Sequence, residues 1–123
     1  MLSRFFESTI YVRVRRDQLH VRHVESGAEV SVSASPPFST ERLLIGQFTV
    51  AEGLLKQAFR ETSGGKLVSP QVLIQPLEMI EGGLSQVEER VLTEAAIGAG
   101  ASKVVVWLGP ELKDDEVKAK LKE

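Results

Sequence analysis

Few residues in this chain combine a reactive type with a useful spacing. His20 and His23 could ligate a metal ion, but three positions along a strand place them on opposite faces, so they cannot share an ion without a bulge. Glu88 and Glu89 could act as paired acids, but adjacent helix positions diverge by about 100 degrees, and carboxylates at a helix start stabilise its free backbone donors. The sequence has no cysteine, which excludes thiol nucleophiles and thiolate metal sites. We therefore predict no catalytic residue, no metal site and no cofactor.

The stretch SGGKL, residues 63 to 67, superficially resembles a phosphate-binding loop. Such a loop has four residues between its glycines and follows a strand, because the backbone must wrap around the phosphates. Here the glycines are adjacent and follow a predicted helix. The stretch therefore indicates a helix-terminating turn.

Three arginines lie close together in the first two predicted strands. Alternation puts Arg13 and Arg15 on one side of the first strand, and Arg22 joins them from the second. If all helices cover the other side of the sheet, these side chains form an exposed basic strip. The strip is either a solvated face or a docking surface for an acidic protein partner, and Arg13, Arg15 and Arg22 are the candidate partner-binding residues.

The start of the chain, MLSRFF, carries Leu2, Phe5 and Phe6 at helical spacing beside Arg4. These apolar residues either pack against the domain's own edge or make a peripheral membrane contact. A single short apolar patch binds lipid weakly without a second signal. Leu2, Phe5 and Phe6 are the candidate membrane-contact residues.

Five predicted strands position these side chains. Residues 8 to 14 alternate with a period of two, LHVRHVE follows after the turn RRDQ, and EVSVSAS forms a third strand that ends at Pro36 and Pro37. VLIQ, residues 72 to 75, and KVVVWLG form two further strands, of which the last is apolar enough to be central or covered on both faces.

Three helices are predicted between and after these strands. Thr49 begins the first, with Glu52 completing a capping box, and the helix extends to about Glu61. Ser85 and Glu88 cap the second in the same way. Its expected buried stripe comprises Leu84, Val87, Val91, Leu92, Ala95, Ala96 and Ala99. The third follows Pro110, with the pairs Asp114 to Lys118 and Glu116 to Lys120 at ion-pair spacing.

Strand, strand, strand, helix, strand, helix, strand, helix is the resulting order. Right-handed crossovers place the last two strands parallel to the first and beyond it, which gives a mixed five-stranded sheet of order 3-2-1-4-5. This is the α/β arrangement of ribonuclease H-like domains, including the actin and Hsp70 ATPase cores. The 123 residues are 42% apolar and 26% charged, which predicts one domain over residues 1 to 123.

With that order, the segment LSQVEERVLTEAAIGAGASKVVVW resembles the MreB family of bacterial rod-shape actin homologues, which reads approximately ITxVERRAxxEAAxxAGAxxVxLIEEP. GQFTVAEGLLKQAFRE and VSPQVLIQP are similar to a helix and a strand that precede it in that family, and MLSRFFESTIYV to the family's start. The resemblance implies a counterpart of subdomain IA. The inserted subdomain IB and the second domain have no counterpart here.

Two departures from the family bear on chemistry. Its D-x-G-T phosphate loop corresponds here to IYVRVRRDQLHV, which has no glycine and in which Asp17 alone cannot restore the loop. Where the family has EEP, with a carboxylate that positions water, this chain has Leu108 and Gly109 before Pro110. Phosphoryl transfer depends on positioning and charge stabilisation, so we expect a scaffold without the ATPase.

We therefore expect a non-catalytic, MreB-like minidomain that acts as a protein-interaction or scaffold module in cell-shape or envelope assembly. The alternative is an ATP-binding or ribonuclease H-like enzyme with an unrecognised site. A net charge of -2 argues against nucleic acid as a partner. The expected location is cytoplasmic; peripheral membrane contact and self-association stay open.

Overall fold

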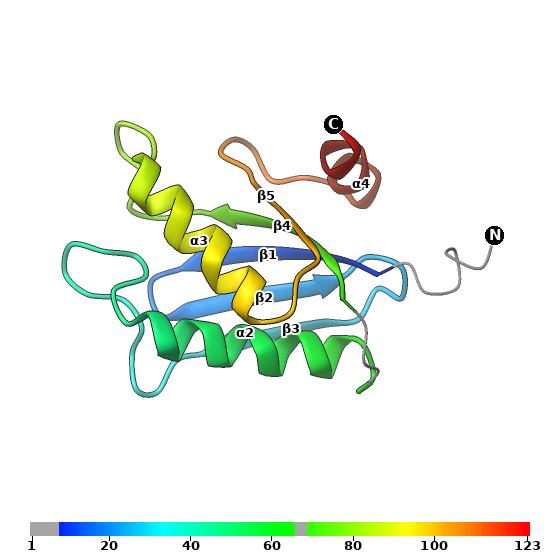
Figure 1. Ribbon diagram of the computed structural model, residues 1–123, viewed down its shortest axis with the longest axis horizontal. Coiled ribbons are helices and arrows are strands. Elements are labelled where there is room, and N and C mark those ends of the chain that lie inside the picture. The colour runs from blue at the N-terminus through cyan, green and yellow to red at the C-terminus, as the bar shows by residue number, and fades with distance from the viewer. Residues whose placement is uncertain (1–7, 66–68) are drawn as a thin grey trace.

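The computed structural model describes residues 8 to 65 and 69 to 123, which form a five-stranded mixed sheet with three helices (Figure 1). The elements are β1 (Thr9–Arg15), β2 (Gln18–His23), β3 (Glu29–Ser33), α2 (Phe48–Thr62), β4 (Gln71–Pro76), α3 (Gln86–Gly98), β5 (Lys103–Val106) and α4 (Asp114–Lys122). The strand order is β3-β2-β1-β4-β5. The predicted fold class and sheet order are confirmed.

β1 is the central strand. It pairs antiparallel with β2 and parallel with β4, and β5 continues the sheet parallel to β4. Ile10, Val12 and Val14 point to one face and have no exposed surface. Tyr11, Arg13 and Arg15 alternate with them and therefore point to the other face.

The main core lies on the face that α2 and α3 cover (Figure 1). Both helices contribute small residues to it, with Ala51 and Ala58 from α2 and Ala95 and Ala96 from α3 all fully buried. Small side chains let the two helices approach each other and the sheet closely, so interdigitated packing rather than helix propensity holds this layer.

The opposite face is not left bare, because α4 packs against it. Val117 and Leu121 of α4 form a second apolar cluster with Tyr11 of β1 and Leu73 of β4, while Val24 is also buried there. An arrangement with all helices on one side is therefore wrong. The reason is that Tyr11, Leu73 and Val105 offer enough apolar surface to bury the short apolar stripe of α4.

The helix starts differ in how far local sequence determines them. Ser85 caps α3 as predicted: its hydroxyl accepts from Glu88 N, and the Glu88 carboxylate accepts from Ser85 N. The capping box at Thr49 is wrong, because α2 begins at Phe48 and its N-cap is Gln47, two residues before Thr49, without a side-chain cap bond.

The ion pairs of the last helix also differ from the expected spacing. Asp114 binds Arg22 of β2, and Lys118 binds Glu25 in the loop after β2. Tertiary partners thus replace the expected Asp114 to Lys118 pair, whereas Lys120 pairs with Glu123, three residues later, instead of with Glu116.

Among the described residues, none of the helices has the length and apolar content needed to cross a membrane. Leu2, Phe5 and Phe6 lie outside the described residues.

Candidate functional site

The carboxyl ends of the parallel strands β1, β4 and β5 meet at one edge of the sheet, termed here the carboxyl edge. Open α/β sheets bind their ligands at this edge. β1 continues there into the two-residue turn Arg16–Asp17, and β4 into the loop after Pro76. The sequence-predicted departures from a nucleotide site fall in this region.

Hydrogen bonds within the chain occupy the position after β1. The backbone N–H of Arg16 donates to Glu78 Oε1 at 2.6 Å, and Leu77 N donates to Val14 O at 2.9 Å. Asp17 adopts a left-handed φ of 54° and accepts from Ser39 N at 2.7 Å. The turn is therefore fixed to two neighbouring loops, and Asp17 has a structural partner.

The segment after β5 is also held by contacts within the chain. Gly109 O accepts from the buried Gln75 side chain at 2.6 Å, and a Cβ added at Gly109 would lie 2.7 Å from Trp107 Cζ2. Trp107 itself is fixed by a bond from its Nε1 to Pro110 O and by Lys120 above its ring. A carboxylate could not take the place of Gly109 unless Trp107 moved.

Tyr11 links this segment to the sheet. Its hydroxyl donates to Gln75 Oε1 and accepts from Leu112 N. Burial raises the pKa of Tyr11 above its ordinary value, because the ionised phenolate loses hydration there. A neutral hydroxyl that both donates and accepts suits a structural hydrogen-bond chain.

On the α4 side of the carboxyl edge lies a groove of about 230 Å³, termed here the basic groove. Its lining residues are Arg13, Arg15, Gln18, His20, Ser31, Leu77 and Glu111. The sheet register places Arg13, His20 and Ser31 side by side on β1, β2 and β3, and Arg15 opposite Gln18. Sequence analysis predicted Arg13 and Arg15 as binding residues but missed His20 and Glu111. His20 reaches the groove because β2 pairs with β1, and Glu111 reaches it from the segment before α4.

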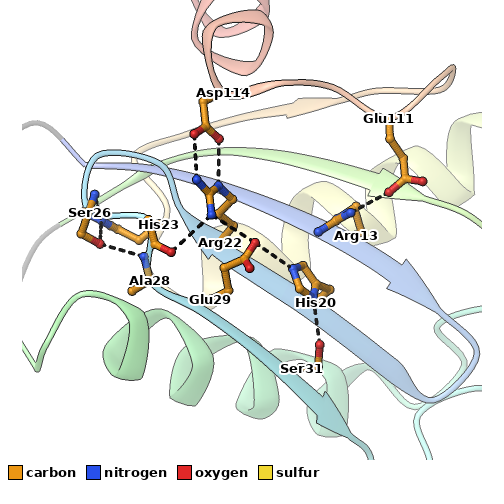
Figure 2. Close-up of polar contacts among 11 residues, drawn as sticks. Arg13, His20, Arg22, His23, Ser26, Ala28, Glu29, Ser31, Glu111 and Asp114 are labelled. Carbon is orange, nitrogen blue, oxygen red and sulfur yellow. Dashed lines mark hydrogen bonds and ion pairs between the residues drawn. The ribbon is translucent and has the colours of Figure 1, made fainter.

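Glu111 is the carboxylate that faces these cations. Its Oε1 accepts from Arg13 Nη1 at 2.6 Å (Figure 2), while half of its side chain remains exposed. The bond from Arg13 holds the pKa of Glu111 below its ordinary value, and the charges of Arg13, Arg15 and His20 add to this effect. Glu111 therefore lies in a field that favours negative charge.

Arg22, the third predicted arginine, is placed elsewhere. Its Nε and Nη2 donate to both carboxylate oxygens of Asp114 at 2.9 and 2.8 Å, and its Nη1 lies 3.1 Å from Glu29 (Figure 2). A bidentate pair of this geometry fixes orientation as well as charge. Arg22 thus anchors α4, and the continuous exposed strip expected from sequence is divided.

The two histidines have separate surroundings, as predicted. His20 contacts Ser31 and Glu29 on one face, whereas His23 contacts Ser8 and Ser26 (Figure 2 shows Ser26). Within residues 8 to 65 and 69 to 123, no group of three histidine, aspartate or glutamate side chains is arranged to hold a metal ion.

On the α3 side of the same edge lies a second, apolar groove. It is lined by Leu43, Leu44, Ile45, Pro76, Glu78, Met79, Leu84, Val87, Glu88, Val91 and Leu92. Leu43 is 46% exposed and Val87 71% exposed, so Val87 does not belong to the buried stripe predicted for α3. Met79 has a left-handed φ of 60°, which is unusual for a residue with a side chain.

Sequence similarity adds one relative. The chain is 44% identical over 103 residues to "Uncharacterized protein YjaA" of Escherichia coli (strain K12), and the match covers 78% of this chain and 80% of that protein. No family model matches the sequence.

Proposed function

The chain belongs to the same family as the Escherichia coli protein YjaA, and we propose that it is a non-catalytic, actin-like domain that docks another protein at the carboxyl edge of its sheet. The observation that carries this proposal is the apolar groove. Leu43 and Val87 expose large apolar side chains beside a groove of about 80 Å³, at the edge where this class of sheet binds ligands. Clustered exposed apolar residues are typical of protein-binding surfaces.

The contacts at the ends of β1 and β5 support a role without nucleotide. A phosphate cradle needs free backbone N–H groups and close backbone approach. The Arg16 N–H is instead bonded to a carboxylate, and Glu78 places negative charge where a phosphate would bind. Trp107 packs against Gly109 at the other strand end.

The resemblance to the MreB family supports a role in cell-shape or envelope assembly. The resembling segments coincide with α2, β4, α3 and β5, which are four consecutive elements of the fold. We propose that the partner belongs to cell-shape or envelope assembly machinery and that the protein works in the cytoplasm, where a chain without cysteine is at no disadvantage.

Site-specific photocrosslinking tests this docking role. A photoreactive amino acid at Val87 should crosslink a partner in lysate from the source organism, whereas the same group at Ile97, 49% exposed on the same helix but outside the groove, should not. A Leu43→Asp substitution should abolish the Val87 crosslink and lower the free energy of unfolding by about 1 kcal/mol, because about half of the Leu43 side chain is exposed. Equal crosslinking from Val87 and Ile97, or none from Val87, would contradict the proposal.

A further inference from the structure

The basic groove has a charge pattern that the apolar groove does not explain. Among the described residues, the side chain of Arg15 makes no ion pair or hydrogen bond, although it is exposed beside Arg13 and His20. Glu111 is the single carboxylate among the lining residues. Apart from His20, the lining carries the two positive charges of Arg13 and Arg15 and the negative charge of Glu111.

The spacing of the two arginines is set by β1. Arg13 and Arg15 are two residues apart in a strand, so their side chains leave the same face and their Cα atoms are about 6.6 Å apart. Acidic side chains at alternate positions of another extended segment have the same repeat. Two such carboxylates would match the two guanidinium groups, each of which can donate more than one hydrogen bond.

Glu111 shows that a carboxylate can bind Arg13 in this groove. Its carboxylate reaches Arg13 from the segment between β5 and α4 and forms one bond, to Nη1. Because its side chain is 51% exposed, it can turn into solvent without disturbing the core. Surface ion pairs of this kind contribute about 1 kcal/mol or less, so an incoming carboxylate can replace it.

We propose that the basic groove binds an extended acidic segment of a protein, with carboxylates at alternate positions facing Arg13 and Arg15, and that Glu111 occupies part of this site in the free protein. The inference deepens the proposed function by naming the partner's charge. Leu77 lines this groove and Pro76, Glu78 and Met79 line the apolar one, so a single partner can contact both around the carboxyl edge.

Binding of blocked model peptides, followed by amide chemical shifts in the full-length protein, tests this inference. The probe is a peptide with two glutamates separated by one glycine, and its control has the same composition with adjacent glutamates. The alternating peptide should bind more tightly and shift the amides of β1. Equal affinity of both peptides, or of inorganic phosphate, would overturn the inference, because the groove would then respond to charge alone.

Two substitutions should change the affinity in opposite directions. Arg15→Gln should weaken the alternating peptide about fivefold, and Glu111→Gln should tighten it about fivefold by removing the internal competitor. Arg60→Gln, which removes the same charge from the exposed end of α2, is the control and should have no effect. A weaker affinity in Glu111→Gln would refute the competitor role. Because these peptides lack apolar side chains, the result is independent of crosslinking at Val87.

Discussion

At the scale of single residues, the positions least tolerant of substitution are those whose buried polar atoms are hydrogen-bonded. Gln75 is fully buried, yet each end of its amide has a partner, in Tyr11 and in the Gly109 carbonyl. Leu73, two residues earlier on the same face of β4, packs in the apolar cluster under α4, but the polar amide of Gln75 does not continue that apolar surface. The structure instead uses it to close the space between β4 and the segment after β5.

Gln75→Leu should lower the free energy of unfolding by about 1 to 3 kcal/mol, because the hydroxyl of the buried Tyr11 loses its acceptor and the Gly109 carbonyl loses its donor. Urea denaturation measures this change. Combined with Tyr11→Phe, the loss should be smaller than the sum of the two single losses, since the residues share one network. Strict additivity would show that they act independently.

The Arg22 to Asp114 pair predicts how stability depends on pH. The hydrogen bonds from Arg22 hold the pKa of Asp114 below its ordinary 3.8. A carboxylate with a lowered folded-state pKa stabilises the fold fully above its unfolded pKa, and this contribution disappears as pH falls through the folded pKa. Asp114→Asn should therefore destabilise by about 1 kcal/mol or less near neutral pH, because the side chain is 44% exposed, and by nothing in strong acid.

Asp115→Asn is the matched control for that measurement. Asp115 lies in the same first turn of α4 and interacts similarly with the helix dipole. Within the described part of the chain, it forms no ion pair. The difference between the two variants, measured by denaturation from neutral to acid pH, should vanish as the pH falls. A difference that persists unchanged in acid would exclude the ion pair as its cause.

At the scale of elements, the helix caps separate what local sequence determines from what packing determines. Ser85→Ala should lower the free energy of unfolding by about 1 kcal/mol, because Glu88 N loses its acceptor at the start of α3. Thr49→Ala should change it by much less, since Thr49 lies within α2 and makes no cap bond. Thermal and urea denaturation of the two variants compare these effects, and equal losses would contradict the assignment.

Sequence patterns predicted the five strands, their order and helix α3 with its Ser85 cap, because alternation and capping are local signals. They failed for the face covered by α4, since nothing local tells Asp114 to bind Arg22 across 92 residues. They also placed Val87 in the core, because its spacing fits the apolar stripe of α3, whereas the helix is rotated so that Val87 borders a groove. The site was thus predictable for Arg13 and Arg15, which share a strand, and not for Glu111.

At the scale of the whole molecule, both grooves lie around the carboxyl edge, while α2 and α3 on one face and α4 on the other complete the structure. The loop after β4 separates the grooves and carries Glu78, which closes the turn after β1. The same loop thus borders both proposed docking surfaces and fixes the turn after β1.

Thermal unfolding with increasing Mg-ATP tests this account most directly. A ligand that binds the native state adds about 2.7 kcal/mol of stability at a concentration one hundred times its Kd, so even weak binding raises the Tm with concentration. We predict a Tm that does not change with Mg-ATP. A Tm that rises with the logarithm of the nucleotide concentration would contradict the claim that the carboxyl edge docks protein and is closed to nucleotide.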